Sequence, residues 1–291
     1  TYVPDDNFEA YLEANGMGDG IALNDSVLTA NINIVTNLYI PPGNIADLTG
    51  IEDFTALTEL HCNWNQLTSL DLSNTTALTV LWCYENQLTS LDVSGATALE
   101  DLYCCDNQLT SLDVSNNTAL KDLDCNDNPL TSLDVSANTA LTFLRCWRNQ
   151  LTSLDVSNNT DLEYLVCHSN QLTSLDVSQN LVQSWLDCRS NQLTSLDVSN
   201  NTALEWLVCH SNQLTSLDVS NNTALTELSC HSNQLTSLDV RNGNNTNFSL
   251  FDASINPNLT CISVDDPAFS AANWIDIDPW TSFDTNCATA L

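Results

Sequence analysis

The sequence has very few basic residues. Five lysines and arginines stand against 37 aspartates and glutamates among 291 residues, so the formal net charge at neutral pH is −32. A field of this sign repels phosphate backbones and anionic membrane surfaces. We therefore expect no nucleic-acid partner and no binding to an anionic bilayer.

Long apolar runs and nucleotide-binding motifs are also missing. The longest apolar run is far shorter than the roughly 20 residues that a transmembrane helix needs, so direct membrane insertion is not expected. Neither a phosphate-binding loop nor a glycine-rich dinucleotide fingerprint is present. The sequence begins at Thr1 without a methionine or a signal peptide, which predicts a mature region from which an export signal has been removed.

The dominant feature of the sequence is a 21-residue repeat. Around each copy lies the frame L-x-x-L-x-C-x-x-N-Q-L-T-S-L-D-V-S-x-x-T-A, with a weaker copy before residue 57 and a degenerate copy after residue 246. The segment L-x-x-L-x-C-x-x-N is the leucine-rich-repeat signature with cysteine in the third apolar place. The cysteines that recur at this interval are Cys62, Cys83, Cys104, Cys125, Cys146, Cys167, Cys188, Cys209 and Cys230.

The alternation within each repeat predicts a short strand. In the first copy, Leu60 and Cys62 point inward and His61 points outward. Stacked repeats pair such strands into a parallel sheet on the concave side of a solenoid. Because no single repeat buries enough apolar surface to fold alone, the ends need caps. The predicted fold class is an α/β solenoid, mostly strand and coil, in the form of a right-handed leucine-rich-repeat horseshoe.

Both ends of the sequence have features of caps. Asp5 and Asp6 can start a short helix that Gly16 would end. Near the other end, Cys261 and Cys287 bracket an aromatic, acidic segment, and we expect them to form a disulfide, which implies an oxidising compartment. The predicted domains are an N-terminal cap over residues 1–35, repeats over 36–260 and a C-terminal cap over 261–291.

Several columns of the repeat do not vary. The asparagines from Asn65 to Asn233 are expected to turn inward and to bond backbone groups of adjacent turns. The ladder cysteines are expected to behave as small hydrophobic core residues, because one thiol per strand does not supply the clustered set that a metal–thiolate site needs. Both columns are therefore predicted to stabilise the fold and not to form a metal site.

The Thr-Ser-Leu-Asp segment is also invariant, from Thr68–Asp71 to Thr236–Asp239. One interpretation is turn chemistry, in which Ser and Asp side chains bond local amides. The alternative is an ice-binding (antifreeze) surface built from regular Thr-Ser rows. The N-x-T triplets, such as Asn116–Thr118, are interpreted as turns rather than glycan acceptors.

The outward strand positions, and the residues just after each strand, vary from repeat to repeat. They hold all four histidines, five of the seven tryptophans and three of the five basic residues. Such a concentration favours recognition, although cross-strand contacts that stabilise the sheet are the alternative. The predicted ligand-binding residues are Trp82, Tyr84, Tyr103, Phe143, Arg145, Trp147, Arg148, Tyr164, His168, Trp185, Arg189, Trp206, His210 and His231.

These aromatic and basic side chains suit an acidic or planar ligand. A carboxylated or sulfated sugar, a peptide with acidic side chains and a neutral glycan all have suitable groups. We expect the partner to be a polysaccharide or a surface glycoprotein, and the protein to act as a monomer.

Acidic side chains gather on two neighbouring repeats of the same face. Their carboxylates could hold Ca²⁺, and the alternative is a solvated acidic face on an acidic protein. No other cofactor is expected. Beside them, Cys105 is expected to be an exposed thiol. The predicted calcium ligands are Asp101, Asp106, Asp122, Asp124 and Asp127.

The sequence gives little support for a catalytic site. Histidine and serine are adjacent at His168–Ser169, His210–Ser211 and His231–Ser232, but adjacent strand residues point to opposite sides, so no pairing as base and nucleophile is expected without a bend in the chain. Asp122 and Asp124 would give a polysaccharide hydrolase only an open site. We expect no enzyme, and hydrolysis of polysaccharide ranks third behind recognition and ice binding.

With these motifs in view, the sequence resembles bacterial secreted or cell-surface leucine-rich-repeat proteins of the Bacteroidetes type. The resemblance rests on the opening Tyr2–Glu9, the N-Q-L-T-S-L-D-V-S-x-N-T-A-L frame and the aromatic segment after Cys261, and the cysteine ladder is similar to that of an internalin-type invasion protein. It implies export, surface display or adhesion, and names no ligand. Two repeats depart from the frame. Gln183 replaces the first leucine, with Leu181 and Val182 before it, so local repacking is expected. Pro129 replaces the glutamine of the N-Q pair, which should be harmless in a loop.

Overall fold

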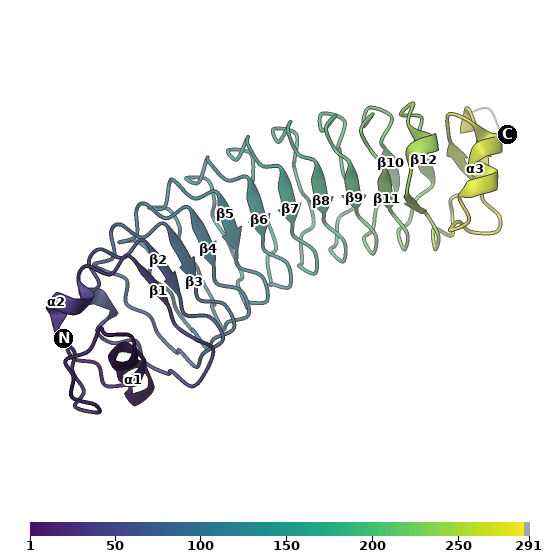
Figure 1. The fold of residues 1–291 in the computed structure, drawn as a ribbon. Helices are drawn as coiled ribbons and strands as arrows, with labels where there is room; N and C mark the ends of the chain where they lie inside the picture. The colour runs from purple at the N-terminus through teal and green to yellow at the C-terminus, as the bar shows by residue number, and fades with distance from the viewer. Residues whose placement is uncertain (288–291) are drawn as a thin grey trace. The chain divides into compact units, whose positions relative to one another are not determined.

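The computed structural model describes residues 1–287, and the chain divides into two compact units between Leu141 and Thr142. Both units consist of successive turns of chain that carry short strands, with helices near the chain ends (Figure 1). The last four residues of the predicted C-terminal cap lie outside the described residues. The predicted domain boundaries stay predictions. In residues 1–287, no helix is long and apolar enough to cross a membrane.

Unit 1 begins with the predicted helical cap. Helix α1 spans Asp6–Ala14, and the carboxylate of Asp5 accepts N–H bonds from Asn7 and Phe8 at 2.9 and 3.0 Å. Gly16 follows with a φ of 74°, the left-handed conformation that commonly ends a helix. The predicted start and stop of this helix are therefore confirmed.

The strands of unit 1 form a parallel sheet in chain order. They pair in register, so Leu60 lies beside Leu81 and Leu81 beside Leu102. In each repeat strand the middle residue is buried and its two neighbours are partly exposed, as the period-2 alternation predicts. After α1, the elements of unit 1 are α2 (Thr29–Ile32), β1 (Asn37–Tyr39), the 3-10 helix η1 (Ile51–Asp53), β2 (Glu59–His61), β3 (Val80–Trp82), β4 (Asp101–Tyr103) and β5 (Asp122–Asp124).

Unit 2 continues the repeat and contains two parallel sheets. Its main sheet has the order β6-β7-β8-β9-β11-β13, and its second sheet has the order β10-β12-β14-β15. The main sheet consists of β6 (Phe143–Arg145), β7 (Tyr164–Val166), β8 (Trp185–Asp187), β9 (Trp206–Val208), β11 (Glu227–Ser229) and β13 (Leu250–Asp252). The remaining elements are β10 (Ser216–Asp218), β12 (Ser237–Asp239), the 3-10 helix η2 (Asn245–Asn247), β14 (Cys261–Ser263), α3 (Pro267–Asn273) and β15 (Ser282–Asp284).

The leucine and cysteine columns form the core. Leu207, the middle residue of β9, and the ladder residue Cys209 are both fully buried. Burial raises the pKa of Cys62 and of Cys209 to about 12, so these thiols stay protonated at neutral pH. The ladder cysteines thus pack as small hydrophobic residues, as predicted.

The predicted asparagine column satisfies backbone groups of adjacent turns. The side-chain amide of Asn86 donates to the carbonyls of Cys62, Cys83 and Tyr84 at 3.0–3.2 Å, and its oxygen accepts the Leu67 N–H at 3.0 Å. The same pattern recurs through the later repeats. One side chain therefore holds two successive turns together, which explains why this column does not vary.

A second asparagine column lies in the core and was not identified from the sequence. The amide of Asn201 donates to the carbonyls of Val177 and Asn180 at 3.0 and 2.9 Å, while its oxygen has no hydrogen-bond partner. The signal was present in the recurrent S-x-N-T segment. The fully buried members of this column are Asn117, Asn138, Asn159, Asn180, Asn201 and Asn222.

The repacking expected around Gln183 does not occur. Gln183 takes the buried place of the missing leucine, and its N–H bonds the Asn180 carbonyl at 3.1 Å, as Leu204 bonds Asn201 in the next repeat. Leu181 and Val182 stay on the surface, 57% and 49% exposed. The prediction was wrong because the interlocking turns on both sides fix the register of the chain.

The invariant aspartates, called here the Asp column, form tight turns. In each repeat the carboxylate accepts the N–H of the residue two positions later, for example Asp197 from Ser199 at 2.9 Å. Hydrogen bonds from the side chain and from the backbone N–H of Ser199 lower the pKa of Asp197. The predicted turn chemistry is therefore confirmed. The Asp column consists of Asp71, Asp92, Asp113, Asp134, Asp155, Asp176, Asp197, Asp218 and Asp239.

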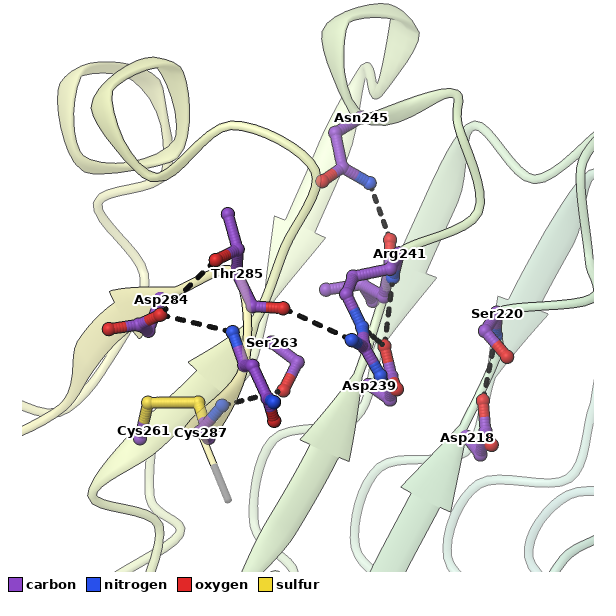
Figure 2. A network of polar contacts seen from close by, with 12 residues as sticks. Asp218, Ser220, Asp239, Arg241, Asn245, Cys261, Ser263, Asp284, Thr285 and Cys287 are labelled. Atoms are coloured by element: carbon purple, nitrogen blue, oxygen red, sulfur yellow. Dashed lines mark hydrogen bonds and ion pairs between the residues drawn. A yellow bond between two sulfur atoms is a disulfide. The ribbon is translucent and has the colours of Figure 1, made fainter. Parts of the chain in front are cut away.

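The C-terminal cap is fixed by a covalent bond and by an arginine (Figure 2). The predicted disulfide joins Cys261 to Cys287 with an S–S distance of 2.03 Å. The guanidinium of Arg241 pairs with Asp239 and also donates to the Thr285 carbonyl at 3.1 Å. The last member of the Asp column thus positions the arginine that ties the cap to strand β12.

Candidate ligand-binding face

The outward side of the main sheet, called here the sheet face, orders its side chains in rows across the strands. In unit 2 the register defines three rows, in which neighbours lie about 4.8 Å apart. The first row holds Phe143, Tyr164, Trp185, Trp206, Glu227 and Leu250. The second row holds Arg145, Val166, Asp187, Val208, Ser229 and Asp252. The third row follows the strands and holds Trp147, His168, Arg189, His210, His231 and Ser254.

The aromatic rings of the first row contact one another in order, with Phe143 tilted by 38° against Tyr164 and the later pairs stacked. Ring centroids lie 5.9 Å apart for Phe143 and Tyr164, 5.1 Å for Tyr164 and Trp185, and 4.0 Å for Trp185 and Trp206. Each ring is only partly exposed, because a neighbour covers a face of it. The row is therefore a stack that presents ring edges, with the outer side of Trp206 at its end. Cross-strand stabilisation and recognition are both compatible with this arrangement.

The third row contains the bend that a contact between each histidine and the following serine requires. The imidazole Nδ1 lies 3.0 Å from the hydroxyl of the following serine in His168–Ser169 and His210–Ser211, and 2.9 Å in His231–Ser232. Each serine has a φ between 53° and 57°, so the chain bends there and returns the hydroxyl to the histidine. Adjacent residues oppose each other only while the strand stays extended, and here the strand has ended.

The arginines of the sheet face are already engaged with neighbouring side chains. Arg145 lies over the rings of Phe143 and Tyr164 at 5.6 and 5.4 Å, and Arg148 lies over Trp147 at 5.0 Å. Both guanidinium groups therefore make cation–π contacts within the face.

Arg189 also has partners of its own. Its guanidinium lies 3.5 Å from the carboxylate of Asp187 and 3.3 Å from Nε2 of His168. Burial, followed by nearby cationic groups, lowers the pKa of His168 and of His210 to about 4, so both rings are neutral at pH 7. Of the predicted basic residues, Arg189 is therefore paired with a carboxylate, and His168 and His210 carry no charge at pH 7.

A hollow of about 290 Å³ lies at the C-terminal end of the sheet face. It exists because the second row has the short side chains Val208 and Ser229, while Trp206 and His210 stand on either side. Three predicted ligand-binding residues contribute to it: Arg189, Trp206 and His210. Residues not predicted for the site complete its lining, and they are Leu207, Val208, Glu227, Ser229, Leu250, Asp252 and Asp276.

Unit 1 has its own aromatic stack. Trp82 lies between His61 at 3.9 Å and Tyr103 at 5.5 Å, with both ring pairs nearly parallel. Tyr84 lies 6.4 Å from Trp82 in a tilted orientation. The predicted ligand-binding residues Trp82, Tyr84 and Tyr103 thus group in unit 1, and the other eleven lie in unit 2.

The predicted calcium ligands lie in unit 1. Asp101 and Asp122 are cross-strand partners, and Asp122 accepts a hydrogen bond from the Tyr103 hydroxyl at 2.8 Å. Burial and the neighbouring Asp122 raise the pKa of Asp101. Asp124 accepts from Asn126, and calcium binding by this group stays a prediction.

A different acidic group in unit 1 has closer geometry. Within the described part of the chain, carboxylate oxygens of Asp6, Glu9 and Asp25 all lie within 4.8 Å of one another. Both oxygens of the buried Glu9 already accept backbone N–H bonds, from Asn24 at 2.9 Å and Asp25 at 3.1 Å. This group is explained by the folding of the N-terminal cap.

The thiol of Cys105 is less accessible than predicted. It is half-buried, and burial followed by the nearby Asp124 raises its pKa, so little of it is thiolate at neutral pH.

Comparisons with known proteins show a similarity to internalins. No family model matches the chain. A 72-residue segment is 45% identical to Internalin J of Listeria monocytogenes serotype 4b (strain F2365), but it spans 25% of this chain and only 8% of that protein. The solved functional domain of InlJ from Listeria monocytogenes, described as including a cysteine ladder, aligns at a TM-score of 0.71 and 35% identity over 97% of this chain and 68% of that chain.

More distant structures share the fold alone. One is the leucine-rich-repeat ectodomain of the plant membrane receptor kinase GASSHO1/SCHENGEN3 from Arabidopsis thaliana, solved in complex with CASPARIAN STRIP INTEGRITY FACTOR 2. It aligns at a TM-score of 0.70 and 20% identity, over 86% of this chain and 32% of that chain.

Proposed function

Because the chain belongs to the internalin-like leucine-rich-repeat proteins, we propose that it is a secreted or cell-surface recognition protein that binds a protein or glycoprotein ligand. The observation that carries the proposal is the sheet face of unit 2, where an aromatic stack ends beside a hollow. Extended sheets of repeat proteins are surfaces on which partners dock, and aromatic residues supply much of the energy of such contacts.

The proposal is one of binding without catalysis. In residues 1–287, no carboxylate hydrogen-bonds the imidazoles of His168, His210 or His231, so the three Ser–His pairs lack the group that orients a catalytic base. The hollow is also open to water, which favours a docking surface over an active site.

Localisation follows from the same relationship. A relative named an internalin supports surface display or secretion, and the Cys261–Cys287 disulfide supports an oxidising compartment. Both remain part of the proposal.

A binding experiment tests this function. Purified protein would be screened against surface glycoproteins and polysaccharides, with calcium or with chelator. Trp206→Ala removes the exposed end of the aromatic stack, and Ser229→Phe fills the hollow while leaving that stack intact. A matched control, Ser216→Ala with Ser237→Ala, changes exposed residues of the second sheet.

Loss of ligand binding by at least about tenfold in both sheet-face variants, with the control unchanged, supports the proposal. Equal binding by all four proteins overturns it. Sensitivity to chelator would add the predicted calcium site, and capture of a polysaccharide alone would replace the protein ligand by a glycan.

A further inference from the structure

The hollow beside Trp206 has an uneven distribution of charge. Asp252 and Asp276 lie on neighbouring chain segments at its C-terminal end, and Glu227 lies on the strand beside Trp206. Glu227 bonds the Ser249 hydroxyl through one oxygen, at 2.8 Å, and Asp252 bonds Ser254 through one oxygen. Each of these two carboxylates keeps a second oxygen for a ligand.

The positive charge at the opposite end is balanced. Arg189 lines the hollow, but its guanidinium lies 3.5 Å from the carboxylate of Asp187. His210 adds no charge at neutral pH. The three carboxylates at one end therefore face the Arg189–Asp187 ion pair, which has no net charge, and the hollow as a whole is anionic.

The rest of the lining is apolar and shallow. The indole of Trp206, the side chain of Val208 and that of Leu250, which is 45% exposed, provide surface for a hydrocarbon chain. The floor at Ser229 is 9% exposed, which limits the depth that a ligand can reach. A long, thin side chain with a cationic end matches both features.

We infer that this hollow takes a lysine or arginine side chain of a protein partner, with its stem against Trp206 and its charged end among Glu227, Asp252 and Asp276. This inference rests on the proposed function and specifies which chemical group of the partner is recognised. At this hollow it replaces the acidic ligand, one of the expectations from the sequence, because the two predicted basic residues that line the hollow are paired with Asp187 (Arg189) or neutral (His210).

The charge of the whole protein acts in the same direction. With a net charge of −32, the protein repels sulfated and carboxylated glycans at long range and accelerates encounter with a basic partner surface. That long-range attraction is not specific to any one site on the protein, so the experiment must separate it from binding in the hollow.

The test uses single side chains as probes. N-acetyl-lysine methylamide and N-acetyl-arginine methylamide would be titrated into the ¹⁵N-labelled protein at physiological salt, with N-acetyl-norleucine methylamide as the uncharged analogue. The readout is the shift of the Trp206 indole signal, which is assigned by its loss in Trp206→Phe.

Two variants with the same change in charge give the control. Glu227→Gln with Asp276→Asn removes two charges at the hollow, and Asp197→Asn with Asp218→Asn removes two from the Asp column. We expect the first variant to weaken the lysine or arginine probe about tenfold and the second to change it less than about twofold. Thermal melts of both variants establish that they fold.

Each outcome bears on the inference. Equal weakening by the two variants means non-specific attraction and overturns it, as does equal binding of the norleucine analogue or no shift at Trp206. If the cationic probes fail but a partner from the screen still depends on Trp206, the proposed function stands and this inference falls.

Discussion

The sheet face and the Asp column of unit 2 are built from the same repeats and behave in opposite ways. Asp197 and Asp218 are identical in sequence and each bonds its own turn, so their chemistry is complete within one repeat. Trp206 and Glu227, one repeat apart on the sheet face, have nothing in common but their register. The Asp column thus has the same structural role in every repeat, whereas the sheet face acquires its properties from the side chains that adjacent repeats place side by side.

The largest effect is expected from breaking the frame itself. Asn191→Ala removes an amide that donates to the carbonyls of Cys167 and Cys188 at 3.1 Å and an oxygen that accepts the Leu172 N–H at 3.0 Å. These backbone groups would be left buried without partners, which costs about 3–5 kcal/mol of unfolding free energy. Urea denaturation followed by circular dichroism measures the loss.

The second asparagine column supplies the matched control. Asn201→Ala removes two bonds donated to backbone carbonyls and a longer one to the Gln183 side chain, but its oxygen has no partner to lose, and the chain already places Ala96 at the equivalent position of another repeat. We expect a loss of about 1–2 kcal/mol. If Asn201→Ala cost as much as Asn191→Ala, the distinction between the two columns would be wrong.

These two columns illustrate how far the sequence predicts the fold. A 21-residue period with alternating Leu and Cys is sufficient to predict the strands, the buried thiols and the bonding of Asn86, because each repeats the same local chemistry. The column of Asn201 was equally visible, but its asparagine lies inside N-x-T triplets that were considered only as turns or glycan acceptors.

The candidate site was harder to predict. The hollow depends on the short Val208 and Ser229 lying beside Trp206 and His210, which becomes evident only when side chains of adjacent repeats are compared in register. The serine next to each of three histidines turns back because a left-handed residue ends each strand there, and serine is not a residue type that signals this conformation.

The next largest effect concerns the C-terminal cap. Cys261→Ser with Cys287→Ser removes a disulfide that closes a 26-residue separation, and we expect a loss of about 2–4 kcal/mol in the stability of the cap. Arg241 still pairs with Asp239 in this variant, so the cap should remain docked at low temperature. Hydrogen exchange of strand β15 measures the change, and unaltered exchange there would show that Arg241 suffices.

A smaller effect is expected from pH on the third row. The folded protein lowers the pKa of His168 and His210 to about 4, below the ordinary value of 6.5, so the unfolded chain binds more protons between these values. Stability contributed by the neutral rings is therefore present above pH 6.5 and is lost as pH falls toward 4. We expect the Tm of the wild type to fall about 2–4 °C more between pH 7 and pH 5 than that of His168→Gln with His210→Gln. Parallel pH curves for the two proteins would exclude a role of these rings.

The smallest effect is expected on the Asp column, although it does not vary from repeat to repeat. Asp197→Asn with Asp218→Asn keeps an oxygen that accepts the Ser199 and Ser220 N–H groups, so the unfolding free energy should change by less than about 0.5 kcal/mol.

The same variant tests the ice-binding hypothesis, in which the exposed Thr-Ser rows contact a crystal and the carboxylates between them oppose that contact by holding water. Thermal hysteresis would be measured for both proteins, and we expect none from either, because charged groups interrupt the hydroxyl array once in every repeat. Hysteresis that rises when the two charges are removed would reverse the comparison: the constant column would then be the functional surface of the protein, and the variable sheet face its scaffold.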